Sequence, residues 1–231
     1  EESLLKAVRS LETGVCHIYH KKFDSWTSDR LLEYIKDGTD DRLYAIAQLI
    51  RNGIDLVLIY NNTKIDMFFL EKFKNIVEFE RVVRDHPMDV ETLRDAKRMG
   101  FSDKYIGQLW GLSEHDMYRL REQHGIFPVY KMIDTCASEF SSYVPYFYST
   151  YEDENESVVS DREKIVVLGS GPIRIGQGVE FDYSTVHAIW SIREAGYEAI
   201  IINNNPETVS TDYTTSDKLY FEPLTVEDVM N

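Results

Sequence analysis

The sequence predicts a multi-domain chain, an all-α helical domain followed by an incomplete α/β domain. Three observations support this prediction. Apolar residues recur every three or four positions through most of residues 3–123, which is typical of packed helices. An acidic run then crosses residues 151–157, and a β-branched strand that leads into a glycine-rich loop follows it. We therefore expect a helical domain at 15–150, an acidic linker at 151–162 and an α/β domain at 163–231.

Helix boundaries in the first region follow from capping residues and glycines. Ser, Thr and Asp side chains favour helix starts because they accept backbone hydrogen bonds, and glycine favours helix ends. The expected helices start at the caps Thr27 or Ser28, Asp40 or Asp41, Asp89, Ser102 and Ser113, and a longer helix runs from Ile65 to Asp85. Periodicity leaves residues 54–60 open between helix and strand.

Composition excludes several classes of function. The 231 residues carry 25 Lys+Arg and 40 Asp+Glu, a net charge of −15, which argues against binding to nucleic acid or to an anionic membrane. No apolar run approaches the roughly 20 residues of a membrane-spanning helix. Two cysteines fit a reducing, cytoplasmic setting. The chain starts at Glu1 without an initiator Met or a signal peptide, so we expect a piece of a longer protein.

Two motifs in the helical region invite a functional interpretation. Helices at 103–110 and 114–123 around Gly111 resemble a helix-turn-helix, but this stretch is almost neutral and lacks the basic stripe that DNA phosphates require. We expect a packed helical pair and keep a DNA-binding regulator as a third hypothesis. His17 and His20 could share a helix face and hold a metal, but no third ligand has a suitable spacing, so we predict no metal site.

The last region has the order of a βαβ unit. Residues 164–168 predict a buried parallel strand, and a helix through 183–195 and a second strand at 199–203 follow it. A third strand at 218–221 and the opening turn of a helix at 226–230 extend this pattern. We expect a Rossmann-like sheet that is not completed within the chain.

The loop after the first strand is the chemical feature of the sequence. Its glycines, Gly169, Gly171 and Gly176, do not have the G-x-G-x-x-G spacing of a dinucleotide site, and no Lys-Ser/Thr follows as in a P-loop. Glycine allows backbone N–H groups to approach an anion, and it also allows tight packing of a strand against a helix. Spacing alone leaves both interpretations open.

Longer motifs are spread over nearly the whole chain. They are GSGPIRIGQGVEFDY at 169–183, NNNPETVSTDY at 203–213, DKLYFEPLTVEDV at 217–229, IFPVYKMIDTCASEF at 126–140, YFYSTYEDENES at 146–157, AKRMGFSD at 96–103 and SLETG at 10–14. Together they resemble the large subunit of carbamoyl phosphate synthetase. The resemblance implies that 1–14 is the tail of the first synthetase half, that the helical domain is the oligomerisation domain, and that 163–231 is the pre-ATP-grasp domain opening the second half.

The resemblance implies a ligase that makes carbamoyl phosphate from bicarbonate, glutamine-derived ammonia and two ATP. In that family a small glutaminase subunit supplies ammonia, and Mg²⁺, with K⁺ as a further candidate ion, accompanies ATP in the whole enzyme. We expect no cofactor, no nucleic acid and no membrane for this chain by itself, and no synthetase activity from it alone. The alternative is a stand-alone oligomerising scaffold or binding module with a Rossmann-like tail.

Candidate site residues cluster in the glycine loop and after the second strand, and we expect no catalytic residue among them. The ligand-path candidates are Gly171, Arg174, Gly176, Gln177, Gly178, Glu180, Asp182, Asn205, Glu207 and Thr208. The resemblance suggests that the loop faces the path of carbamate. An ion pair for Arg174 and a loop-locking role for 205–208 remain the structural alternatives.

Aromatic residues suggest that the helical domain also associates copies of the chain. They are Phe68, Phe69, Phe73, Phe79, Trp110, Tyr143 and Tyr146, more than one small core obviously needs. We expect a homo-oligomer formed through this domain, with a purely core role for all seven as the alternative.

Overall fold

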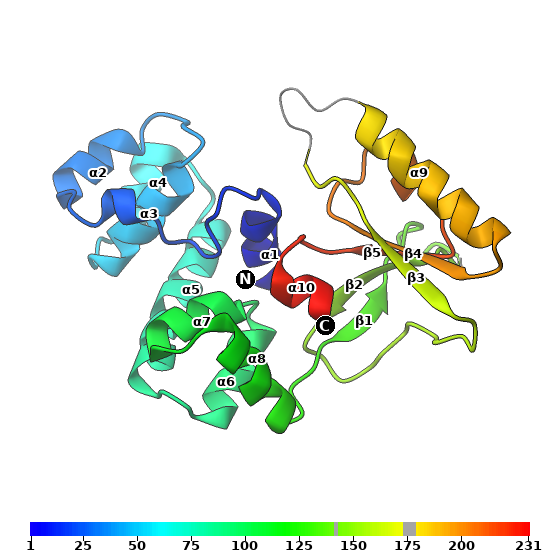
Figure 1. Cartoon of the computed structure of the whole chain (residues 1–231). Helices are drawn as coiled ribbons and strands as arrows, with labels where there is room; N and C mark the ends of the chain where they lie inside the picture. Colours follow the sequence, from blue (N-terminus) through cyan, green and yellow to red (C-terminus); the bar gives the residue numbers. More distant parts are fainter. Residues whose placement is uncertain (141–142, 173–178) are drawn as a thin grey trace. The chain divides into compact units, whose positions relative to one another are not determined.

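The computed structural model describes residues 1–140, 143–172 and 179–231 (Figure 1). The chain divides into two compact units. The first, which we call the helical unit, comprises Glu1–Arg9 and Thr13–His124, and the second, the sheet unit, comprises Ser10–Glu12 and Gly125–Asn231. The expected sequence of a helical domain and an α/β domain is therefore confirmed as a fold class.

The helical unit is built from eight α-helices and one short 3-10 helix. They are α1 (Glu2–Ser10), η1 (Lys21–Phe23), α2 (Ser28–Tyr34), α3 (Arg42–Arg51), α4 (Leu56–Thr63), α5 (Met67–Asp85), α6 (Val90–Arg98), α7 (Asp103–Trp110) and α8 (Glu114–Gln123). Thr27, Asp89, Ser102 and Ser113 accept backbone hydrogen bonds at helix starts as predicted. Periodicity leaves residues 54–60 open between helix and strand, and the structure shows a helix. Helix α4 begins at Leu56, and its N-cap residue Asp55 accepts a hydrogen bond from the backbone N–H of Val57.

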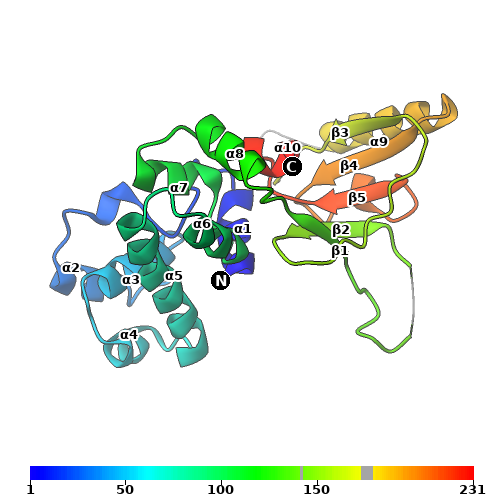
Figure 2. The ribbon, with the colours of Figure 1, turned by 90° about the horizontal axis from the view of Figure 1, so that it is seen from below.

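Helix α5 is the central helix of the helical unit, and α3, α4, α6 and α7 all pack against it. Its buried residues lie at helical spacing and include Leu70, Ile76, Val77 and Val83. Figure 2 shows the neighbouring helices grouped along its length. Burial of this apolar stripe, rather than helix propensity alone, is what stabilises a helix of this kind.

Two ionic clusters lie inside the helical unit. Asp103 at the start of α7 is fully buried and accepts hydrogen bonds from Lys97 on α6, at 3.1 Å, and from Nε of Arg121 on α8, at 2.8 Å. This cluster explains the residue types of the motif AKRMGFSD, since its Lys and Asp tie two helices to a third. It also ties Arg121 of the second helix of the helix-turn-helix-like pair to Asp103 of the first, which supports the packed-pair interpretation.

The second cluster joins α5 to α3 and to the segment before η1. Glu80 accepts a hydrogen bond from Nε of Arg51 at 2.9 Å and bonds Nε2 of His17 at 2.9 Å. Burial raises the pKa of Glu80, but Arg51 and His17 outweigh it and lower that pKa to about 2. The His17 ring stacks on Tyr105 with 3.7 Å between ring centres, and its burial lowers the pKa of the imidazole.

The sheet unit is a mixed five-stranded sheet. Its strands are β1 (Val129–Met132), β2 (Tyr146–Thr150), β3 (Lys164–Leu168), β4 (Glu198–Asn203) and β5 (Lys218–Phe221), and its helices are α9 (Val179–Glu194), η2 (Val209–Thr211) and α10 (Val226–Met230). The strand order is β1-β2-β5-β4-β3, with β1 antiparallel to β2 and all other pairs parallel (Figure 2).

The structure moves the boundary between the units to an earlier position than the sequence suggested. We expected helices to residue 150 and a linker at 151–162, whereas the units divide between His124 and Gly125. β1 and β2 lie in the stretch expected to be helical, and Tyr146 of β2 pairs with Leu219 of β5. Because β2 pairs with residues far away in the chain, the local sequence carries little sign of these short strands. The periodicity of apolar residues therefore did not predict them.

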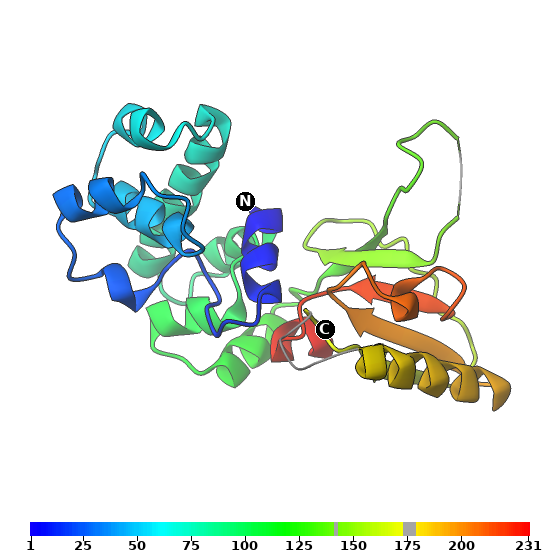
Figure 3. The same ribbon diagram turned by 90° about the horizontal axis from the view of Figure 1, so that it is seen from above.

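The burial of β3 also differs from expectation. We expected a buried parallel strand, but β3 is the edge of the sheet, and Ile165, Val166 and Leu168 are 38%, 49% and 52% exposed. Figure 3 shows α9 running along β3 and β4 on one face of the sheet. The core beneath this helix contains Ile189, Ala199, Ile201 and Leu219. An apolar composition therefore identified the strand but not its place in the sheet.

Candidate functional site

The candidate site lies where the parallel strands β3, β4 and β5 end. In open α/β sheets, ligands bind outside the carboxyl ends of the strands, where the connecting loops converge. Here β3 leads into Gly169, β4 ends at Asn203, and Leu168, the last residue of β3, is paired with Ile202 of β4. The glycine loop and the loop after β4 therefore leave the same edge of the sheet.

Asn203 holds the glycine loop against β4. Its fully buried side chain accepts hydrogen bonds through Oδ1 from the backbone N–H of Gly171 at 3.1 Å and of Asn204 at 3.0 Å. A Cβ atom at residue 169 would lie 2.7 Å from Cβ and Nδ2 of Asn203, so only glycine fits there. Gly171 has φ of +72°, a conformation that glycine adopts without strain. Both glycines thus serve close packing at this edge.

Asp182 locks the start of α9 to the loop after β4. Its carboxylate oxygens accept from the backbone N–H of Ser210 in η2, both at 3.2 Å. Thr208, the residue before η2, places its hydroxyl 3.2 Å from that of Ser210 and 3.3 Å from that of Thr211. The loop-locking alternative is therefore supported for Asp182 and Thr208.

The other candidate residues that the structure describes place polar side chains at this edge of the sheet. Asn205 is half-buried, and its Oδ1 accepts from the N–H of Glu207 at 3.0 Å, which closes a tight turn. The side chains of Glu180, in the first turn of α9, and Glu207 are exposed. Arg174, Gly176, Gln177 and Gly178 lie outside the described residues.

A short segment from the start of the chain also belongs to the sheet unit. Ser10–Glu12 is grouped with it, and Nδ2 of Asn204 donates to the carbonyl oxygen of Ser10 at 2.9 Å. The Glu12 side chain occupies the space next to Gly171. Sequence reasoning missed this contribution, and it missed Asn203. The only available signal for Asn203 was a polar residue that ends an otherwise apolar strand run.

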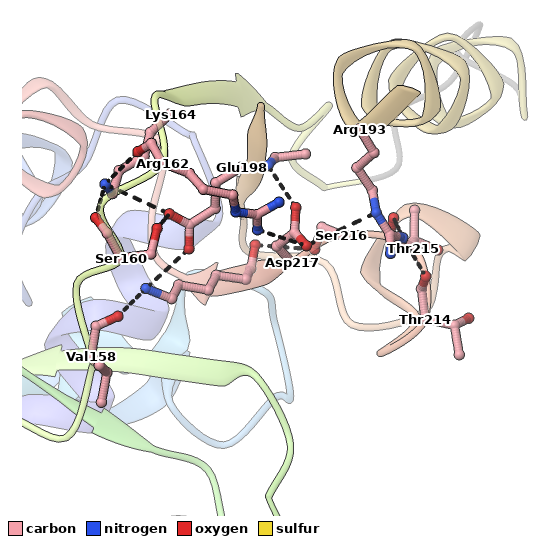
Figure 4. Close-up of polar contacts among 12 residues, drawn as sticks. Val158, Ser160, Arg162, Lys164, Arg193, Glu198, Thr214, Thr215, Ser216 and Asp217 are labelled. Atoms are coloured by element: carbon pink, nitrogen blue, oxygen red, sulfur yellow. Dashed lines mark hydrogen bonds and ion pairs between the residues drawn. The ribbon is translucent and has the colours of Figure 1, made fainter. Parts of the chain in front are cut away.

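The opposite end of the same strands carries a network of ions (Figure 4). Glu198 at the start of β4 is almost fully buried and lies 3.3 Å from Nζ of Lys218 at the start of β5. Ser160 donates to Glu198 at 2.5 Å, and Lys164 donates to the carbonyl of Ser160 at 2.6 Å. Burial raises the pKa of Glu198, but the bonds from Ser160 and Lys218 outweigh it and lower that pKa.

This network fixes the acidic crossing segment instead of forming a second ligand site. Lys218 donates to the carbonyl oxygen of Val158, so it holds residues before β3 onto the sheet. Asp217 completes the network, since it lies 3.1 Å from Arg162 and accepts from the N–H of Ala199 at 2.8 Å. The later part of the segment expected to be a linker is thus anchored to the sheet through Val158, Ser160 and Arg162.

The structure does not bring His17 and His20 together as ligands of one metal ion. His17 bonds Glu80, whereas Nδ1 of His20 accepts from the N–H of Lys22 at 3.1 Å and caps η1. Within the described ranges 1–140, 143–172 and 179–231, no group of three or more His, Cys, Asp or Glu side chains is placed to hold a metal ion. In the same ranges, no helix is both long and apolar enough to cross a membrane.

Comparison with family models gives each unit a relative. Residues 1–125 match the oligomerisation domain of the carbamoyl-phosphate synthetase large chain, and residues 161–231 match the preATP-grasp domain of carbamoyl phosphate synthase. The first match ends at the division between the two compact units, and the second covers β3 to α10 with the loops of the candidate site. The chain therefore belongs to the carbamoyl-phosphate synthetase large-chain family.

Proposed function

We propose that this chain is the central part of the large subunit of a glutamine-dependent carbamoyl phosphate synthetase. The observation that carries the proposal is the order of the two matches, an oligomerisation domain followed by a preATP-grasp domain. In this proposal the helical unit associates large subunits. The sheet unit supplies the first strands of the half that phosphorylates carbamate. A small glutaminase subunit delivers ammonia to the complete cytoplasmic enzyme.

The carboxyl edge of β3 and β4 is the part of this chain that we assign to the carbamate path. Carbamate is a labile anion, so it has to travel enclosed from water. Among the described residues the amide of Asn205 is the donor offered here, and the resemblance adds Arg174, which lies outside the described residues. The exposed carboxylates of Glu180 and Glu207 repel an anion, which favours passage along the amide side of the edge.

ATP and Mg²⁺, with K⁺, are expected of the whole family enzyme. The described residues do not by themselves fit an ATP–Mg²⁺ site, because they bring together no group of three potential metal ligands and the glycine loop has no P-loop lysine. We therefore assign nucleotide binding to other parts of the large subunit. The role left to the described residues is to hold the loops at the sheet edge in place.

Two measurements test the proposal. The purified chain, supplied with ATP, bicarbonate and ammonia, is expected to form no carbamoyl phosphate, and detectable product would contradict the proposed division of labour. In a large subunit that carries this chain, Glu207→Lys is expected to lower overall synthesis. The bicarbonate-dependent ATPase and the formation of ATP from carbamoyl phosphate should persist, because only transfer between the two reactions is disturbed.

A matched control is Glu194→Lys at the far end of α9. This variant makes the same change of charge on the same unit, away from the strand ends, and it should leave all three activities unchanged. Equal loss of overall synthesis and of a partial reaction in Glu207→Lys would contradict the path assignment and would indicate a local folding defect instead.

A further inference from the structure

One surface of the helical unit presents large apolar side chains that its own core does not cover. Val57, Leu58 and Tyr60 of α4 and Phe68 and Phe69 of α5 are between 38% and 58% exposed. We call these five residues the α4–α5 face. The two helices pack against each other, and Figures 1 and 2 both place α4 beside the first turns of α5. A contiguous group of exposed large apolar side chains is typical of an interaction surface.

The exposure of this face follows from how its helices are buried. Only Ile59 of α4 is buried, so most of its Leu-Val-Leu-Ile run points away from the core. On α5, Leu70 is buried while the preceding Phe68 and Phe69 are not. Phe73 and Phe79 on the same helix are half-buried, and Phe79 packs on Phe101. The four phenylalanines of α5 therefore separate into two half-buried residues and one exposed pair, whereas Tyr143 and Tyr146 of the expected aromatic set belong to the sheet unit.

A groove lies beside these exposed rings. Its apolar walls include Ile50, Ile54, Leu56, Met67 and Val77, and its volume of 390 Å³ is enough to take an aromatic side chain. Met67 directly precedes Phe68, and Val57 both lines the groove and belongs to the α4–α5 face. Protruding rings and a receiving groove thus share one surface of the unit. A two-fold axis through such a surface lets each copy insert its rings into the other's groove.

Charge also favours a second copy of this chain as the occupant. Two copies of a protein with a net charge of −15 repel each other over most of their surfaces. The α4 residues 56–63 and the first α5 residues 67–70 contain no charged side chain. The charged residues that line the groove are two acids, Asp55 and Glu78, and two bases, Lys74 and Arg81, so their charges cancel. This face is therefore one where like-charged copies approach without net repulsion.

We propose that the α4–α5 face binds the same face of a second copy of this chain, with Phe68 and Phe69 of each copy in the groove of the other. The inference rests on the proposed self-association of the helical unit and names the surface that carries it. The aromatic pair supplies the large buried side chains that dominate the binding energy of such interfaces.

Sedimentation equilibrium of the full chain tests this surface. Wild type is expected to associate reversibly, and Phe68→Ser/Phe69→Ser should weaken association by about 10-fold or more, as expected for loss of central aromatic residues. Val82→Ser is the matched control, because Val82 is 39% exposed on the same helix but does not belong to the face. It should leave the dissociation constant unchanged. Urea unfolding of each variant confirms that it is folded.

Disulfide trapping supplies a second, direct readout. Two single-cysteine chains, Phe69→Cys and Ile54→Cys, each with Cys16 and Cys136 changed to Ser, should form a mixed dimer on oxidation. Wild type that associates, with no sensitivity to the Phe68/Phe69 change and no mixed dimer, would overturn this surface and leave self-association intact. Wild type that stays monomeric would overturn the proposed self-association and the surface together.

Discussion

In the helical unit, Asp103 lies fully buried between Lys97 and Arg121, whereas in the sheet unit Asp217 meets Arg162 and Arg193 at the more open end of three strands. The first arrangement takes its charges out of water and depends on complete pairing inside the protein. The second remains in contact with solvent, where water and salt weaken each pair. These two clusters of ion pairs therefore differ in energetic weight.

The two units also differ in which apolar side chains they leave exposed. The helical unit leaves the five apolar side chains of the α4–α5 face exposed, with Val82 and Met88 as further exposed apolar residues. The sheet unit leaves its edge strand β3 partly exposed and has a small core beneath one helix. In the helical unit, the exposed apolar face is the surface that we propose for association. The sheet unit combines an open edge strand with a tightly locked loop at the candidate site.

The largest expected effect comes from opening the buried cluster. Asp103→Ala removes the carboxylate that lies between Lys97 and Arg121, and loss of one partner of a buried ion cluster costs about 3–5 kcal/mol. Urea unfolding measures the loss. The control is Asp95→Ala, whose exposed pair with Arg98 is 3.7 Å long and should matter little. Equal unfolding midpoints for the two variants would contradict the special weight given to the interior cluster.

The next effect depends on pH. The pKa of Glu80 is about 2 in the folded chain against an ordinary 4.5, so its stabilisation is present above pH 4.5 and is lost as the pH falls toward 2. A shift of this size corresponds to about 3 kcal/mol. The pKa of His17 is lowered by burial, so the unfolded chain binds a proton first as the pH falls through 6.5, which further lowers stability.

Urea unfolding between pH 7 and pH 3 checks this prediction. The free-energy difference between wild type and Glu80→Gln should shrink as the pH falls below 4.5. His17→Gln should flatten the wild-type decline between pH 6.5 and pH 5, because glutamine can bond Glu80 without titrating. Profiles that remain parallel for all three proteins would show that this cluster does not set the pH dependence.

A smaller effect is expected at the candidate site. Gly169→Ala forces a Cβ atom against Asn203, and such overpacking costs about 1–3 kcal/mol. In the double variant with Asn203→Gly the cost of the added methyl group should fall, since both the Cβ and the amide group that obstruct it are gone. Gly38→Ala is the control, because a Cβ there meets nothing within 4 Å. Strictly additive effects in unfolding experiments would contradict the contact between Gly169 and Asn203.

The smallest effect is expected at the amino end of the strands. Arg162→Ala removes a 3.1 Å pair to Asp217 whose arginine is half-exposed, and such pairs contribute about 0–1 kcal/mol. The difference from wild type should vanish in 1 M NaCl. A loss of unfolding free energy as large as that of Asp103→Ala would contradict the conclusion that the exposed pair of Arg162 contributes less than the buried cluster around Asp103.

The sequence predicted the helical unit better than the sheet unit, for physical reasons. Caps such as Asp89, Ser102 and Ser113 act on neighbouring residues, so their effect is visible in a short window of sequence. The strands β1 and β2 gain their place through pairing with each other and with distant β5, which no window reveals. For the same reason the apolar β3 was expected to be buried, whereas it lies at the edge of the sheet and is partly exposed.

The sequence predicted that the candidate loops share one edge of the sheet, but not how their side chains interact. The structure brings Asp182 together with the start of η2 and Gly171 together with Asn203. The role of Asn203 depends on a side chain that folds back over Gly169, which a residue type alone does not reveal. The segment Ser10–Glu12 belongs to the sheet unit although it is far from the rest of that unit in the chain. Its contribution is therefore visible only in the folded structure.

We propose above that the helical unit brings copies of this chain together. Sedimentation equilibrium of the unmodified full chain over a wide concentration range tests this self-association most directly. The weight-average mass is expected to rise reversibly from the 27.0 kDa of one chain toward that of a dimer or larger assembly. A single species of 27.0 kDa at every concentration would contradict it.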